Sequence, residues 1–383
     1  MEVDARGSQG IQQGDNNRMW NLFVNLGLPP ALSRALVLLI VVALLGGGTW
    51  AVASWVLPWL APTYRTQFLI DTTAEEPESI ARSLRQAVQN AGDQDSLALR
   101  GFGGECGAPD NTTQLVDFGT GNRQEITQAA GQRRGGRPTL LRGVVEAVAD
   151  FAGPFTLRAT QVNRIILVTR HGTDACDEDT AFVGKEIKDR LAAAGLTIEL
   201  RLVGYQLPGD QRDRLKQIAG GAGAPEPLFA ADQAGLDAAL EFVTNAEPVL
   251  RYAKEIVDIF NPTVERVNTA GTAIVEGRLD VAERTLAEAR ESAGQAGPRL
   301  DGLRERARTQ QAQDIQRQAD ALRAQLDRIL TAANSLLATA RSAQSLDPGL
   351  TAFRGFAADY NAKVTSMNKA IAALRATAPA APR

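Results

Sequence analysis

Few residues in this sequence carry the chemistry of common enzyme active sites. His171 is the only histidine among 383 residues, and it lies in a polar loop. No G-x-S-x-G nucleophile turn precedes it, and no Walker A phosphate loop occurs in the chain. We therefore predict that the protein is not an enzyme.

A concentration of positive charge is also missing. The 41 Lys and Arg residues are offset by 44 Asp and Glu residues, with the two signs interspersed along the chain. Proteins that bind nucleic acid need a basic patch or stripe, so we expect no nucleic-acid partner. An apolar content of 44% predicts that most of the chain folds, and the length favours two or three domains.

Only one long hydrophobic run is present, and it covers residues 35–61 without a charged residue. About 20 apolar residues span a bilayer, so the run predicts a transmembrane helix. Ala51-Val52-Ala53 resembles a signal-peptide cleavage site, which is the alternative. The long polar segment before the run favours an uncleaved anchor.

Basic residues near this run indicate its orientation. Arg18 and Arg34 precede it, whereas Arg65 alone follows it closely. The positive-inside rule then predicts a cytoplasmic tail over residues 1–34. We expect a single-pass protein of the cell membrane, with everything from residue 66 onward outside the cell.

The two cysteines both follow the hydrophobic run. Cys106 and Cys176 lie in polar loops, each just after a strand-like stretch. A lone pair in an exported domain is typical of a disulfide bond. Two buried, unpaired thiols are the alternative.

Strand-like and helix-like stretches alternate after the run. Apolar, β-rich segments occur at 67–70, 97–102, 164–169 and 198–204. Amphipathic stretches with helical spacing lie between them, for example at 181–195. This alternation predicts an α/β domain with a doubly wound, mostly parallel sheet.

Three loops in this domain resemble those of a von Willebrand factor A (vWA) domain over residues 66–245. They are the Asp-Thr-Thr turn after the first strand, the segment in which Thr139 precedes a helix, and the loop after the third apolar run. The end of the region is similar to a bacterial secreted subtype with paired cysteines at GGEC and DAC. The resemblance implies ligand binding at the carboxyl ends of the strands.

The resemblance also implies a metal-ion-dependent adhesion site with Mg²⁺ as its cofactor. The matching ligands here are Asp71, Thr73, Glu75 and Thr139. Where the family has a further Asp, this chain has Arg170. A guanidinium stays protonated and cannot bind a cation.

Two interpretations of this site therefore stay open. In one, Glu75 or Asp174 compensates for the missing carboxylate and Mg²⁺ binds. In the other, Arg170 forms an ion pair with Asp71 in place of the metal. In either case the ligand would be recognised at Asp71, Thr73, Thr139, Arg170 and Asp174.

The region 246–377 is predicted to be helical. We expect breaks at Asn261-Pro262, at Gly294 to Pro298 and at Asp347-Pro348-Gly349. Apolar residues repeat every seven positions in the longest predicted helix, at Ile315, Leu322, Ile329, Leu336 and at Ala319, Leu326, Ala333, Ala340. This seam favours a bundle within the chain, with an intermolecular coiled coil as the alternative. Residues 378–383 are expected to be disordered.

The N-terminal tail contains a segment, residues 10–23, that resembles the RHIM-like amyloid signalling motifs. Gln13 departs from the motif because it replaces an apolar residue. Gln and Asn ladders can stabilise a cross-β stack, which would allow self-association. A disordered tail with chance spacing is the alternative.

These observations favour a membrane-anchored binding protein that recognises a protein or envelope ligand. The alternative is a transmembrane signalling protein whose tail nucleates assembly in the cytoplasm.

Overall fold

The computed structural model describes residues 64–73, 77–152 and 161–379. The predicted transmembrane run, the RHIM-like segment, Glu75 and the last four residues of the predicted disordered end lie outside these ranges. Within them, no helix is long and apolar enough to cross a bilayer. The described residues fall into two compact units that divide after Asn245, and each is described by itself.

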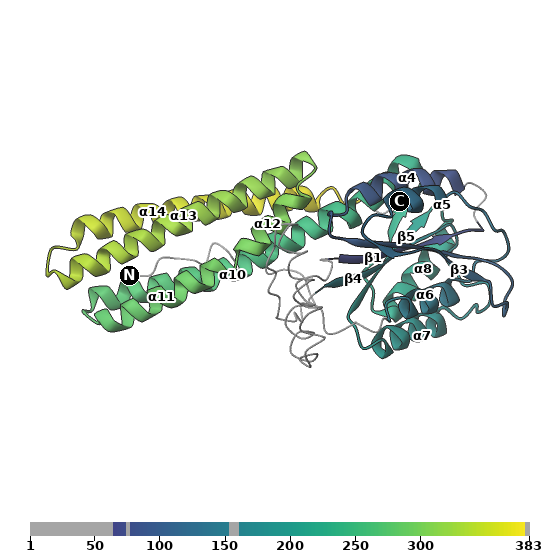
Figure 1. The fold of residues 1–383 in the computed structure, drawn as a ribbon, viewed down its shortest axis with the longest axis horizontal. Helices are drawn as coiled ribbons and strands as arrows, with labels where there is room; N and C mark the ends of the chain where they lie inside the picture. Colours follow the sequence, from purple (N-terminus) through teal and green to yellow (C-terminus); the bar gives the residue numbers. More distant parts are fainter. Residues whose placement is uncertain (1–63, 74–76, 153–160, 380–383) are drawn as a thin grey trace, which may run out of the picture. The chain divides into compact units, whose positions relative to one another are not determined.

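The first unit contains a six-stranded sheet in the order β3-β2-β1-β4-β5-β6. Figure 1 labels four of these strands, β1, β3, β4 and β5. Its strands are β1 (Tyr64–Asp71), β2 (Ser96–Phe102), β3 (Thr112–Gly119), β4 (Val162–Thr169), β5 (Ile198–Tyr205) and β6 (Leu228–Ala230). All neighbouring pairs are parallel except β2 and β3. The predicted α/β class with a doubly wound, mostly parallel sheet is therefore confirmed.

Helices cover both faces of this sheet. They are α4 (Pro77–Gln89), α5 (Arg123–Ala129), α6 (Leu140–Ala149), α7 (Thr180–Ala193), α8 (Gly209–Ala222) and α9 (Gln233–Glu241). Successive side chains of a strand point to opposite faces. Phe68 and Ile70 accordingly pack with α4, α5 and α9, whereas Leu69 packs with α6, α7 and α8. The central strands read as continuous apolar runs because both faces are buried.

The order of the strands reverses at β1. The chain proceeds from β1 through β2 to β3, and β4 then pairs with the other side of β1. Ligands of open α/β sheets bind outside the carboxyl ends of the strands at such a reversal. In this chain, Asp71 ends β1 and Thr169 ends the neighbouring β4.

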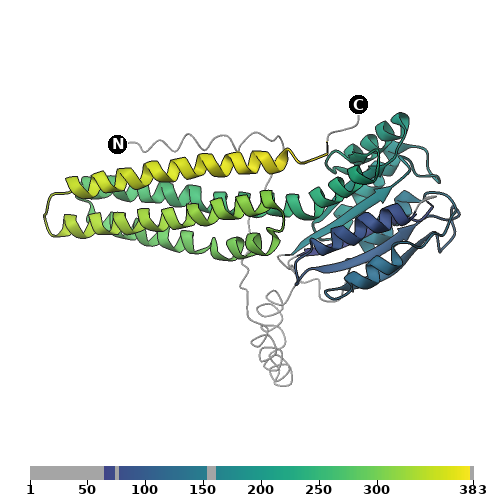
Figure 2. The same cartoon turned by 90° about the horizontal axis from the view of Figure 1, so that it is seen from above.

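The second unit is a helical bundle (Figure 2). It contains α10 (Glu247–Val275), α11 (Leu279–Gly294), α12 (Gly297–Arg306), α13 (Gln310–Arg341) and α14 (Asp347–Arg375). A short π-helical turn, η2 (Phe242–Ala246), precedes α10 in the sequence. The helix α10 packs against α11, and α13 packs against both α14 and α10.

Two details of the predicted helices are wrong. Pro262 lies inside a continuous α10 rather than ending a helix. It removes one backbone donor, but buried neighbours such as Phe260 and Val267 hold the helix in the bundle. The longest predicted helix is instead divided between α12 and α13, where the hydroxyl of Thr309 accepts a hydrogen bond from the backbone N–H of Ala312.

The heptad seam of α13 faces the interior of the chain's own bundle. Every residue of the seam is buried except Ala340, which is half-buried. The interpretation as an intramolecular bundle is therefore confirmed. The same residues are not exposed for a coiled coil with a second chain.

We predict that Leu326→Ala lowers the free energy of unfolding by about 2–5 kcal/mol, because Leu326 is fully buried in this seam. The matched control is Thr331→Ala at an exposed position of the same helix. The measurement is urea denaturation followed by far-UV circular dichroism. The intramolecular seam would be contradicted if Leu326→Ala left the stability unchanged and instead caused an oligomer to dissociate.

Candidate functional site

The carboxylate of Asp71 is buried at the end of β1 and is surrounded by hydrogen-bond donors. Its Oδ1 accepts from the backbone N–H of Thr73 at 3.0 Å and from the hydroxyl of Thr73 at 2.6 Å. Its Oδ2 lies 2.7 Å from Nδ1 of His171. The hydroxyl of Thr169 and the backbone N–H of Arg170 each lie 3.3 Å from the same oxygen. Both oxygens are thus engaged by residues after β1 and β4.

These contacts determine the charge at the site. Burial disfavours the ionised carboxylate, but hydrogen bonds from His171 and Thr73 outweigh it and lower the pKa of Asp71 below its ordinary value. An ionised carboxylate can only accept hydrogen bonds, so we assign the 2.7 Å contact to a proton on Nδ1 of His171. The sequence suggested only a solvated loop histidine, but the imidazole side chain is just 35% exposed.

The ion pair between Arg170 and Asp71, which one of the two interpretations predicts, is not formed. The guanidinium of Arg170 donates to Oε1 of Gln206 and lies 5.5 Å from the centre of the Tyr205 ring. Only the backbone N–H of Arg170 reaches Asp71. The reason is that β5 ends beside β4, so the amide of Gln206 and the ring of Tyr205 lie next to the guanidinium. His171 contacts the carboxylate instead.

Thr139 and Asp174 are both buried, and both are committed to contacts that fix the backbone. The hydroxyl of Thr139, directly before α6, donates to the carbonyl of Asn111 at 2.7 Å. Oδ2 of Asp174 accepts from the backbone N–H of Leu141 at 2.8 Å, in the first turn of α6. A carboxylate there satisfies a free donor and interacts favourably with the helix dipole.

A disulfide bond joins Cys106, after β2, to Cys176, after β4. The predicted pairing of the two cysteines is therefore confirmed. The backbone N–H of Ala175 also donates to the carbonyl of Pro138 at 2.8 Å. The loops after β2 and β4 and the loop before α6 are thus tied together.

The loop before α6 also lies across the ends of β1 and β2. The carbonyl of Thr72 accepts from the backbone N–H of Arg134 at 3.1 Å, and Gly104 and Arg137 exchange two backbone hydrogen bonds. A Cβ atom at position 136 would lie only 2.6 Å from the Cα of Gly104. The φ of +88° at Gly136 also favours glycine. Close backbone approach therefore holds this loop over the strand ends.

The described residues do not fit a magnesium site. Mg²⁺ requires six oxygen ligands in octahedral geometry. Hydrogen bonds engage both oxygens of Asp71, the hydroxyl of Thr139 donates to a carbonyl, and Asp174 caps α6. Across the described ranges, no cluster of three or more acidic, histidine or cysteine side chains is placed to hold a metal ion.

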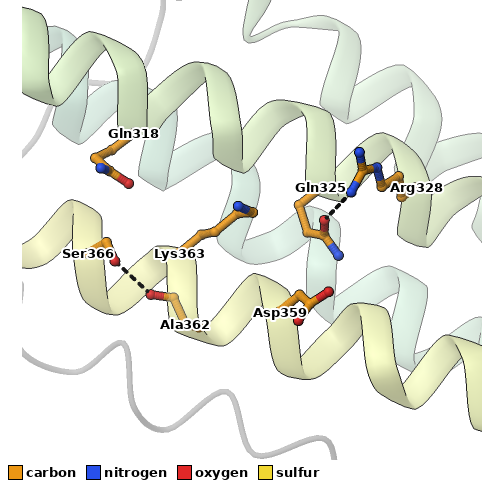
Figure 3. A pocket seen from close by; sticks show the side chains of 7 residues that line it. All are labelled: Gln318, Gln325, Arg328, Asp359, Ala362, Lys363 and Ser366. Atoms are coloured by element: carbon orange, nitrogen blue, oxygen red, sulfur yellow. Dashed lines mark hydrogen bonds between the residues drawn. The ribbon is translucent and has the colours of Figure 1, made fainter.

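The helical unit has a polar depression of about 370 Å³ between α13 and α14 (Figure 3). Its buried side chain, Gln325, donates to the carbonyl of Phe356 at 2.9 Å and accepts from Arg328 at 3.4 Å. The side-chain amide of Gln325 is thus already hydrogen-bonded to residues of α13 and α14. We therefore place the candidate site in the sheet-containing unit.

No protein-family model matches the chain, and no curated protein matches its sequence. Among solved structures, it is similar to the open conformation of the pilus adhesin SpaC from Lactobacillus rhamnosus GG, with 16% identity and a TM-score of 0.38 over 47% of this chain and 29% of that chain. It is also similar to a von Willebrand factor type A structure from Catenulispora acidiphila, with 16% identity and a TM-score of 0.37 over 47% of this chain and 42% of that chain.

A third similar structure is the vWF domain of the type V pili tip protein Mfa5 from Porphyromonas gingivalis, with 13% identity and a TM-score of 0.35 over 48% of this chain and 94% of that chain. The chain spans less than a third of the adhesin chain. The strand order of this chain itself supports the doubly wound fold that the vWA resemblance implies. We interpret the site from this chain's own residues.

We predict that Asp71→Asn lowers the free energy of unfolding by about 2–3 kcal/mol at neutral pH. The reason is that the donors around Asp71 lose the buried negative charge to which they donate. The folded-state pKa of Asp71 is below the ordinary 3.8, so its stabilisation is present above that pH. The difference between wild type and Asp71→Asn should shrink as the pH falls below 3.8.

The measurement is urea denaturation across this pH range, followed by near-UV circular dichroism. The control is Asp213→Asn, an exposed carboxylate on α8, which should change stability by less than about 1 kcal/mol. A destabilisation by Asp71→Asn that grows towards acid pH would show that the sign assigned to the Asp71 pKa is wrong.

Proposed function

We propose that residues 64–245 form a binding domain that recognises a protein ligand at the C-terminal edge of its sheet, without a resident metal ion. The observation that carries this proposal is the cross-linking of the loops at that edge. The disulfide, the Asp71 hydrogen bonds and the contact of Asp174 with α6 join loops from β1, β2 and β4. Residues that are tied together before binding lose less entropy when a ligand binds, which favours affinity.

Binding also suits the side chains of this edge better than catalysis does. The carboxylate of Asp71 orients the ring of His171, as it would in a catalytic triad. Such a pair needs a nucleophile within hydrogen-bond reach of the ring. Both cysteines are in the disulfide, and the hydroxyl of Thr169 donates to the backbone carbonyl of His171. We therefore propose that His171 shapes and supports the surface.

The cellular setting of this domain is part of the proposal. A membrane anchor over residues 35–61 would place the binding domain and the bundle outside the cell, facing a protein or envelope ligand. A disulfide between the two cysteines suits that compartment. Signalling through the RHIM-like segment remains a prediction from the sequence alone.

Arg170 offers a direct test of this surface, because it lies after β4 and is held in place by Gln206 and Tyr205. A random peptide library would be selected on the immobilised full chain, and the affinities of the enriched peptides would be measured by calorimetry. We predict that Arg170→Glu weakens their binding at least about tenfold, a typical effect of reversing a charge within an interface.

The matched control is Arg85→Glu, which reverses an exposed arginine on the outer side of α4. It should leave the affinities unchanged, as should removal of divalent cations with EDTA. Peptides whose affinity is lost with Arg85→Glu but not with Arg170→Glu would place binding elsewhere. An EDTA-sensitive affinity would contradict the metal-free proposal.

A further inference from the structure

The disulfide between Cys106 and Cys176 joins two exposed residues. Cysteine is among the residue types most often buried in proteins, yet neither of these cysteines belongs to the two hydrophobic clusters that pack on the faces of the sheet. Exposed disulfides are the ones that thiols reduce most readily. The bond thus lies where a thiol can approach it without unfolding of the sheet.

This disulfide makes a link that no other described contact duplicates. It joins the loop after β2, residues 103–111, to the loop after β4, residues 170–179. Across the described part of the chain, no hydrogen bond or ion pair runs directly between these two loops. Each loop is instead hydrogen-bonded to residues 137–141 before and at the start of α6. Opening the disulfide would therefore remove the direct connection between the two loops.

Each loop also has hydrogen bonds of its own, which do not involve the sulfur atoms. In the loop after β2, the backbone N–H of Ala108 donates to the carbonyl of Glu105 at 3.1 Å. In the loop after β4, Oδ1 of Asp174 accepts from the backbone N–H groups of Cys176 and Asp177 at 2.8 and 3.0 Å. We therefore expect reduction to free the two loops from each other while the domain stays folded.

The linked loops belong to the edge of the sheet at which we propose ligand binding. The loop after β4 contains Arg170 and also His171, whose ring contacts Asp71. Residues that are tied together before binding lose less entropy when a ligand binds. Without the disulfide, the two loops can adopt more arrangements relative to each other, so binding would cost more entropy. The affinity at this edge should thus depend on whether the disulfide is closed.

We propose that this disulfide is a site of reversible thiol–disulfide exchange, at which a dithiol reductant opens the bond and weakens ligand binding at the edge. This inference rests on the proposed function and adds its regulation. The reductant is a dithiol because its second thiol can release the protein from the mixed disulfide that the first thiol forms.

The exchange takes place in two steps. One thiolate of the reductant attacks a cysteine sulfur, which breaks the S–S bond, forms a mixed disulfide and releases the other cysteine. The second thiolate of the reductant then displaces the first cysteine from the mixed disulfide. Two electrons and two protons have then passed from the dithiol to Cys106 and Cys176, and the reductant leaves as a disulfide. Reoxidation by an external disulfide is the reverse reaction.

The first test needs no ligand. The folded full chain would be incubated with dithiothreitol and then with iodoacetamide, and the modified cysteines would be identified by mass spectrometry. We expect both cysteines to be modified without urea, with an unchanged far-UV circular dichroism spectrum. Hydrogen–deuterium exchange of residues 104–108 and 174–177 should become at least about tenfold faster on reduction, whereas that of β4 should not change.

A disulfide that dithiothreitol reduces only in urea would overturn the proposal. Loops whose hydrogen exchange stays the same after complete reduction would overturn it as well, because the bond would then not restrain them.

The second test measures binding, with cysteine-free peptides that the library yields on the oxidised full chain. Reduction should weaken their binding at least about tenfold, and reoxidation with oxidised glutathione should restore it. The control is the double variant Cys106→Ser/Cys176→Ser, verified to fold by circular dichroism. It should bind the peptides weakly both with and without dithiothreitol. An effect of dithiothreitol that persists in this variant would not pass through the disulfide and would overturn the proposal.

Failure of this inference differs from failure of the proposed function. Peptides that lose affinity with Arg170→Glu but keep it after complete reduction would leave the binding surface in place and overturn its control by the disulfide. A chain that selects no peptide, although reduction releases its loops, would overturn the proposed function and with it the effect on binding, while the site of exchange would stand.

Discussion

The hydrogen bonds to the buried carboxylate of Asp71 join the loops that form the C-terminal edge of the sheet. A buried charge is stable only when it is fully hydrogen-bonded, and here the donors come from both sides of the reversal in strand order. Thr73 approaches from the loop after β1, and His171 and Arg170 from the loop after β4. The position of each loop therefore depends on the other. Asp174 and the disulfide extend this linkage to α6 and to the loop after β2.

This arrangement changes what the site can recognise. A divalent cation would attract one ligand carboxylate strongly and place it at a single point. In the metal-free binding that we propose, recognition would instead depend on the shape of the joined loops and on the guanidinium of Arg170. The proposed affinity would then draw on contacts that already tie these loops together before a ligand binds.

The sequence predicted features that depend on neighbouring residues. The strand ending at Asp71 and the helix after Thr139 follow from local patterns, and α13 follows from its heptads. Of the contacts across long separations, the disulfide was predictable because the chain has only two cysteines, but the contact between Asp71 and His171 was not. Asp71 and His171 are 100 residues apart, and nothing near His171 distinguishes it from a solvated loop residue. Pro262 shows the same limit, because packing overrides its local tendency to end a helix.

We assign a hydrogen bond from Nδ1–H of His171 to the carboxylate of Asp71, at the position where the vWA resemblance implies a metal ion. Because the chain has one histidine, its ring gives a single set of signals in ¹⁵N NMR. The full chain would be labelled and its ring nitrogens recorded with EDTA and then with excess Mg²⁺. We predict an Nδ1–H protected from exchange with water, which Mg²⁺ leaves unchanged and Asp71→Asn exposes to exchange. An Nδ1–H signal that disappears or shifts when Mg²⁺ is added would contradict the account.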